Sequence, residues 1–370
     1  MAAAEHPAKK LKKEIIGGVV TLASGHDMPV IALGTWKSPP GKTKEAVICA
    51  IKAGYRNIDA ANDYNNEHEV GEAIAECIAA GIVKREELFI QAKLWNSNHR
   101  PEHIMADLEQ TLKDLRLTYL DSWVIHWPMA VPASGKFCAT RVQGSGAKTG
   151  PWEENPMFPL DAEGYFCSDD ESHYVETWQF MEGLVEKGVV RSIGLSNFNK
   201  KQINEVVAIA KVPVSTLQNE CHPYLQQKDL IDLCRFHNIH FQAFSPLGSG
   251  DTHLAESTSP TGTIPLKDKH ILALAEKYGK NAGQIMLRWA VQRGTTVVSK
   301  SVTPARIESN IQVFDWELSA EDMEGMSALN CGWRHLMWSE TSMHKDYPFR
   351  DELAPGYVVQ KAPKITSSGN

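Results

Sequence analysis

Short apolar runs of strand length alternate with longer segments of helical periodicity along most of the chain. Several helical segments stop at a glycine, the residue that most often ends a helix in the left-handed conformation. Strands are predicted at 29–33, 56–60, 88–94, 121–127, 190–196, 214–220, 239–245 and 295–299. Helices are predicted at 42–53, 66–80, 101–115, 173–187, 200–210, 227–238, 268–278, 281–293, 304–311 and 319–329.

Each predicted strand is followed by a helix, and no polar linker separates the units. This order favours a closed (β/α)8 TIM barrel over an open sheet, with extra helices and long loops at its C-terminal face. A small β-hairpin is predicted over 15–22, before the first barrel strand. The first strand leads into Gly34-Thr35-Trp36, which does not match the glycine fingerprint of a doubly wound dinucleotide-binding fold.

The expected organisation is one large domain over residues 15–350. A disordered extension is expected at 1–14 and a tail at 351–370. Within the domain, a long inserted loop is predicted at about 129–172. Loops of this length are usually functional or disordered. Its stretch 134–150 is polar and rich in glycine and serine, so we expect that stretch to be mobile.

Composition narrows the class of protein. The net charge is −7, from 38 basic and 45 acidic residues, which argues against a nucleic-acid partner. The 7 cysteines are scattered without a CxxC pair, as in a cytosolic protein with reduced thiols, and no metal site is expected. The N-terminus lacks the apolar core of a signal peptide, and no apolar run has membrane-spanning length.

Four complementary side chains follow three successive predicted strands: Asp59 with Tyr64, then Lys93, then His126. The carboxyl ends of the strands of a barrel converge on one face, so these side chains are expected to form one acid–base unit. Tyrosine, with an ordinary pKa of about 10, needs a cationic neighbour to donate a proton near neutral pH. Lys93 would be that neighbour and Asp59 its counter-ion, while His126 would orient a carbonyl oxygen. The alternative is that these residues are caps or isolated ion pairs, which also perturb pKa values.

Several motifs resemble the aldo-keto reductases, most closely the aldose/aldehyde reductase group, and the resemblance extends over about 15–349. The segments that carry it are Gly34–Pro40, Ile58–Tyr64, Ala92–Trp95, Ile125–Pro128, Gly194–Phe198, Gln218–Tyr224, Ser245–Ser249, Lys300–Arg306 and His344–Phe349. The resemblance implies that Asp59, Tyr64, Lys93 and His126 are the catalytic tetrad. It also implies that NADP(H) is the cofactor.

The cofactor residues implied by the resemblance are Thr35, Trp36, Lys37, Ser196, Asn197, Gln218, Phe244, Ser245, Leu247, Ser249, Asp251, Lys300, Ser301, Thr303, Arg306 and Asn310. Phe244 stands where the family usually has a tyrosine stacked on the nicotinamide, and the stacking face is kept. Ser309 replaces a glutamate that usually contacts the adenine. Asp251 would pair with Lys37 and Lys300 to fold its loop over the pyrophosphate.

The substrate pocket is expected to be lined by Trp36, Asp63, Trp95, Trp127, Trp333 and Trp338. Together these expectations describe a cytoplasmic, monomeric reductase that converts aldehydes, and some ketones, to alcohols with NADPH. Two alternatives remain open. One is a redox-sensing regulatory subunit that binds the cofactor on the same fold. The other is a metal-dependent barrel hydrolase, which needs further His or Asp ligands at the strand ends.

Overall fold

The computed structural model describes residues 18–133, 157–249 and 258–362. The predictions made for 1–14, for 134–150 and for Asp251 therefore lie outside the described residues. In the described part of the chain, no helix is both long enough and apolar enough to cross a membrane.

Eight parallel strands close into a barrel, in the order β10-β3-β4-β5-β6-β7-β8-β9, which confirms the predicted fold. The ring closes because β10 pairs in parallel with both β3 and β9. The barrel strands are β3 (Ile31–Gly34), β4 (Asn57–Asp59), β5 (Phe89–Leu94), β6 (Ser122–Ile125), β7 (Ile193–Ser196), β8 (Thr216–Glu220), β9 (His240–Phe244) and β10 (Thr296–Lys300).

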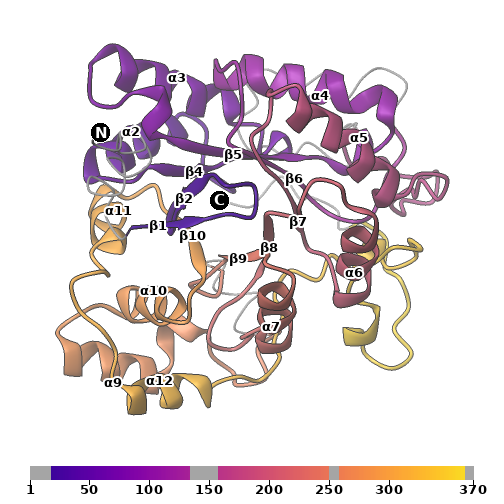
Figure 1. Cartoon of the computed structure of the whole chain (residues 1–370). Coiled ribbons are helices and arrows are strands. Elements are labelled where there is room, and N and C mark those ends of the chain that lie inside the picture. Colours follow the sequence, from indigo (N-terminus) through magenta and orange to yellow (C-terminus); the bar gives the residue numbers. More distant parts are fainter. Residues whose placement is uncertain (1–17, 134–156, 250–257, 363–370) are drawn as a thin grey trace.

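Helices surround this ring of strands (Figure 1). They are α2 (Thr43–Ala53), α3 (Glu67–Ala79), α4 (Pro101–Leu115), α5 (Tyr174–Glu186), α6 (Lys200–Ile209), α7 (Lys228–Phe236), α9 (Lys269–Tyr278), α10 (Ala282–Gln292), α11 (Pro304–Ile311) and α12 (Ala320–Ser327). Two of them, α9 and α12, are additional to the one-helix-per-strand pattern and pack against each other. Their apolar faces, with those of the other helices, form one core with the outward-facing strand residues.

The N-terminal hairpin exists, but its predicted place was wrong. It is formed by β1 (Val19–Thr21) and β2 (Asp27–Pro29), whereas the sequence indicated 15–22. The turn uses Gly25 at φ 82°, a left-handed conformation that glycine adopts without a steric penalty. Pro29 consequently belongs to the hairpin, and the first barrel strand begins at Ile31. Figure 1 shows β1 and β2 near the middle of the ring of strands.

Candidate active site

The parallel register brings the predicted acid–base residues to one end of the barrel. Asp59 is the last residue of β4, and Lys93 is the next-to-last residue of the neighbouring β5. His126 directly follows β6, which pairs with β5. Tyr64 ends η1 (Asn62–Tyr64), a short 3-10 helix in the connection after β4. The structure therefore places all four side chains as the sequence predicted, at the carboxyl ends of consecutive strands.

Lys93 and Asp59 form a buried ion pair. The Nζ atom of Lys93 donates to Asp59 Oδ2 at 2.7 Å and to the Ala60 carbonyl at 3.1 Å. The Lys93 and Asp59 residues are 0% and 3% exposed. Burying two charged groups this deeply is costly unless each is well paired, and this geometry pairs them.

Tyr64 lies beside this pair. The Nζ atom of Lys93 is 5.0 Å from the centre of the Tyr64 ring, and the His126 ring is 5.8 Å from it. Burial raises the pKa of Tyr64 well above its ordinary value, and the Asp59 and Asp63 carboxylates raise it further. The sequence indicated that Lys93 would lower this pKa, whereas burial and the nearby carboxylates raise it. The phenol is therefore fully protonated at neutral pH, as a proton donor requires.

His126 sits between polar and aromatic neighbours. Its Nδ1 atom is 3.1 Å from Asp63 Oδ1, although the two are not aligned as a hydrogen bond. Its ring meets Trp95 edge-on, with the ring centres 5.3 Å apart. Its backbone carbonyl accepts a hydrogen bond from Asn197 Nδ2 at 3.0 Å. The imidazole therefore packs against Trp95. Asn197, which directly follows β7, holds the His126 backbone in place.

The residues expected to hold the nicotinamide gather at the next strand ends. Ser196 ends β7 and donates to the Gln218 carbonyl on β8 at 2.8 Å. Asn197 adopts φ 61°, and its Oδ1 atom is buried without a hydrogen-bond partner. An unpaired buried acceptor at this place suits the amide N–H of a carboxamide. Phe244 ends β9 and is partly exposed. These residues fit a nicotinamide ring.

A second group of predicted cofactor residues surrounds the start of α11. Lys300 ends β10, and Thr303 is the residue that precedes α11. The Thr303 amide donates to Ser301 Oγ at 3.1 Å. Arg306, in the first turn, is exposed. Two cations beside a helix N-terminus provide a site suited to a phosphate group.

The remaining predicted cofactor residues lie around the same barrel end. Lys300 pairs in register with Gly34 of β3, which brings it near the segment that carries Lys37. Thr35 donates its hydroxyl to the Asp59 carbonyl at 2.9 Å. The Ser245 carbonyl accepts a hydrogen bond from the Gly248 amide at 2.8 Å, and the Lys37 ammonium lies 4.6 Å from the centre of the Trp36 ring. The other predicted cofactor residues are Leu247, which packs against the main core, Ser249 and Asn310.

Aromatic residues from distant segments gather beside His126, which the Trp95 ring contacts. Trp95, Trp127 and Trp338 form one apolar cluster. The Trp95 and Trp338 rings stack at 5.7 Å. Trp333 instead packs with Tyr224 and Ile264 in a separate cluster.

The inserted loop adds residues that the sequence did not single out. Trp95 Nε1 donates to the Met157 carbonyl at 2.7 Å, and the Phe158 ring lies 4.9 Å from Trp95 and 5.9 Å from Trp338. Phe166 lies 5.6 Å from Trp338. Their apolar character in an otherwise polar loop is the sequence signal that could have identified them as contacts of the tryptophan cluster. The loop thus adds aromatic residues to the cluster that contacts His126 through Trp95.

The buried carboxylate of Glu220 anchors the C-terminal segment that carries Trp333 and Trp338. Glu220, at the end of β8, accepts from the amides of His335 and Leu336 at 2.9 and 2.8 Å. It also pairs with His222 at 2.9 Å. Burial alone would raise the pKa of Glu220, but the hydrogen bond to His222 and nearby Arg334 lower it. The Glu220 carboxylate therefore holds this C-terminal segment against the barrel.

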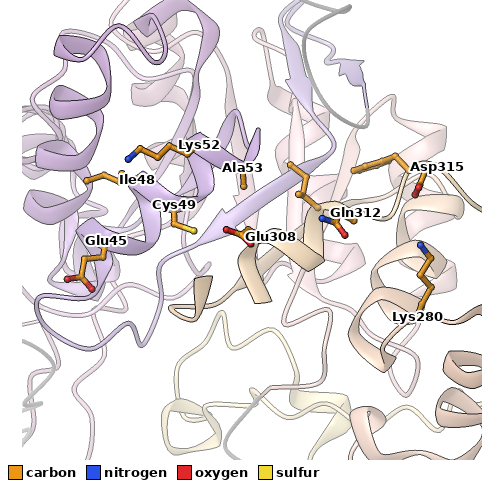
Figure 2. Close-up of a pocket in the computed structure, with 11 residues that line it drawn as sticks. Glu45, Ile48, Cys49, Lys52, Ala53, Lys280, Glu308, Gln312 and Asp315 are labelled. Carbon is orange, nitrogen blue, oxygen red and sulfur yellow. The ribbon is translucent and has the colours of Figure 1, made fainter. Parts of the chain in front are cut away.

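Two other features lie apart from this site. A cavity of about 840 Å³ lies between α2 and α11 on the outside of the barrel, and none of the predicted site residues lines it (Figure 2). Figure 2 shows Cys49 and Lys52 from α2 opposite Glu308 from α11. Among the described residues, no three His, Cys, Asp or Glu side chains are grouped closely enough to hold a metal ion.

Comparison with known proteins agrees with this geometry. The model of the Aldo/keto reductase family matches residues 30–330. "Aldo-keto reductase family 1 member A1" of Pongo abelii is 44% identical over 342 residues, which cover 90% of this chain and 98% of that protein. The protein of that name from Xenopus tropicalis is 44% identical over 338 residues, with 91% and 96% covered.

Among solved structures, the aldose reductase from Schistosoma japonicum superposes with a TM-score of 0.79 at 37% identity, covering 90% of this chain and 99% of that one. The resemblance drawn from the motifs is thereby confirmed. This chain belongs to the aldo/keto reductase family and is an oxidoreductase that acts on carbonyl groups with a nicotinamide cofactor.

Proposed function

We propose that this chain is an NADPH-dependent reductase that converts aldehydes, and some ketones, to alcohols, with Tyr64 as the proton donor. The observation that carries the proposal is the buried Lys93–Asp59 pair beside Tyr64 and His126 at one end of the barrel. A cytoplasmic monomer without a nucleic-acid partner is part of the proposal, in keeping with the net charge of −7.

Each residue has one task in the proposed reaction. The bound nicotinamide supplies the hydride. Asn197 and Gln218 would hold its carboxamide, and the Phe244 ring would stack on one face of the nicotinamide. His126 donates a hydrogen bond to the carbonyl oxygen and orients it between the aromatic walls. Tyr64 passes its phenolic proton to that oxygen as the carbon accepts the hydride.

Lys93 stabilises the phenolate that Tyr64 becomes. The ammonium is already 5.0 Å from the Tyr64 ring centre, so the new negative charge forms beside a fixed positive one. Asp59 pairs with the ammonium in the buried site and holds it in place. Preorganised charges of this kind stabilise a transition state without reorganising during the reaction.

The choice of NADPH rests on Lys300 and Arg306. Arg306→Ala is expected to weaken NADPH binding about tenfold or more, because one hydrogen bond to a charged group contributes roughly 1.5–3 kcal/mol. NADH binding should change little, since NADH lacks the 2′-phosphate. Fluorescence titration with both cofactors measures this. Arg235→Ala, at an exposed arginine of α7, is the matched control. An equal loss for both cofactors would show that Arg306 has a structural role only.

Phe158 is expected to limit the size of the substrate, because its ring lies against Trp95 and Trp338. Phe158→Ala should lower KM several-fold for bulky aromatic ketones and raise it for small aldehydes, which lose an apolar contact. KM for NADPH should stay unchanged. Phe236→Ala, which removes an 82% exposed phenylalanine, is the control. An unchanged substrate profile in Phe158→Ala would show that the inserted loop does not shape the pocket.

Activity is tested by following NADPH oxidation with sugar, aromatic, steroid and short aliphatic carbonyls. Turnover with at least one class is expected, and the product should be the alcohol. A protein that binds NADPH tightly but turns over none of them would instead support the regulatory-subunit alternative.

A further inference from the structure

Three buried glutamines lie inside the barrel next to the tetrad. Gln91 on β5, Gln218 on β8 and Gln242 on β9 are 1%, 2% and 1% exposed. The interior of such a barrel is usually filled by branched apolar side chains. A buried amide is costly unless its hydrogen bonds are made, so three of them at this depth need a reason.

The strand register puts these amides and Asp59 opposite one another. Asp59 pairs with Gln91 between β4 and β5, and Gln218 pairs with Gln242 between β8 and β9. In the closed ring β4 lies opposite β8, and β5 lies opposite β9. The two pairs therefore face each other across the barrel interior.

Hydrogen bonds join the two sides. Gln91 Nε2 donates to Asp59 Oδ1 at 2.7 Å and to Gln242 Oε1 at 2.9 Å. Gln218 Nε2 donates to the same two acceptors, each at 2.9 Å. Gln242 Nε2 returns a bond to Gln91 Oε1 at 3.1 Å and reaches the Met28 sulfur of the hairpin at 3.0 Å.

The carboxylate sets the direction of the whole network. An ionised Asp59 can only accept, so Gln91 and Gln218 must turn their N–H groups toward it. Gln242 must then present its oxygen to both of them. Asp59 Oδ1 is thus occupied by two amides, which leaves Oδ2 for Lys93 at 2.7 Å.

We propose that Gln91 and Gln242 are positioning residues, which hold the Asp59 carboxylate across the barrel so that one oxygen is reserved for Lys93. This inference rests on the proposed function, because its effect is read through Tyr64. Gln91 contacts Asp59 directly, and Gln242 acts through Gln91 and Gln218. Neither residue is placed at the substrate or at the cofactor.

The expected effect has a definite sign. The charged or titratable groups around Tyr64 are Asp59, Asp63, Glu67, Lys93 and His126. Removing an amide donor concentrates negative charge on Asp59, which raises the pKa of Tyr64 and weakens it as an acid. Reduction requires the protonated phenol. The rate of the reduction at neutral pH should therefore fall, while the binding of NADPH should not change.

The test measures kcat and KM for reduction of a nitrobenzaldehyde by NADPH at pH 7. Gln91→Met replaces the amide by an apolar chain of similar length. It should lower kcat about tenfold or more, as for loss of one hydrogen bond to a charged group. KM for NADPH should stay within about twofold of wild type, because the network does not contact the adenosine side of the site.

Gln242→Met should lower kcat by less, since Gln91 keeps its bond to Asp59. The double variant should resemble Gln91→Met, because the two residues act as one unit. The double variant replaces Gln91→Met in the test if Gln91→Met does not fold, because it leaves neither of the two paired amides without its partner. Gln226→Met is the control: Gln226 is a buried glutamine that donates to the Pro223 and Met326 carbonyls away from Asp59. It should lower thermal stability without changing kcat.

A Gln91→Met protein, or a folded double variant, with wild-type kcat would overturn the inference. An equal loss of kcat in Gln226→Met would do so as well, because it would mark a general loss of rigidity. Wild-type protein that fails to oxidise NADPH would contradict the proposed function instead, so the two failures are distinguishable.

Discussion

Tyr64→Phe is expected to lower kcat for carbonyl reduction by about 10²–10⁴-fold, the usual contribution of general acid catalysis. The ring remains and keeps its place beside Lys93 and His126, so the fold and the cofactor site should be intact. Only the phenolic proton is lost. Steady-state kinetics with NADPH and an aromatic aldehyde, together with fluorescence titration of NADPH, measure both quantities.

Tyr174→Phe provides a matched control, because Tyr174 is a buried tyrosine whose hydroxyl bonds to Glu205 at the outer helices. This variant should keep near wild-type kcat. Activity of Tyr64→Phe within a few-fold of wild type would rule out Tyr64 as the acid.

Lys93→Met is expected to reduce the free energy of unfolding by roughly 3–5 kcal/mol at neutral pH, besides abolishing most turnover. The substitution leaves the Asp59 carboxylate buried without its cation, although Gln91 and Gln218 still donate to it. Denaturant unfolding monitored by circular dichroism gives the loss of stability.

The double variant Asp59→Asn/Lys93→Met should recover part of that stability, because it removes both charges together. Lys228→Met is the control at an exposed pair, since Lys228 bonds to Asp232 at 2.6 Å on the surface of α7 and should change stability little. If Lys93→Met were as stable as this control, the buried pair would not have the role assigned to it.

The sequence was sufficient to predict the barrel and the placement of Asp59, Tyr64, Lys93 and His126 after three successive strands. Strand and helix periods differ, and three of the short apolar runs lead directly into a polar residue, so Asp59, Lys93 and His126 were visible as strand-end residues. Their proximity followed from the barrel alone. The hairpin was misplaced because Gly17-Gly18 and Ser24-Gly25 are both turn signals, and only packing selects the second.

The features that the sequence did not reveal depend on contacts across the barrel. Gln91 stands two residues before Lys93, so strand alternation already places both on the same side of β5. Nothing in that pattern says that Gln242, on the opposite strand, completes its hydrogen bonds. The rise in the pKa of Tyr64 likewise depends on the depth of burial, and the packing of Phe158 against Trp95 depends on where the loop returns.

The central claim is that Tyr64 and its neighbours reduce a carbonyl with hydride taken from NADPH. The direct test supplies NADPH carrying deuterium at the transferable position of the nicotinamide, with an aromatic aldehyde, and analyses the product by mass spectrometry. Wild-type protein should yield the alcohol with one deuterium on the carbinol carbon, and Tyr64→Phe almost none in the same time. An absence of alcohol with the wild-type protein, or alcohol without deuterium on that carbon, would contradict the account.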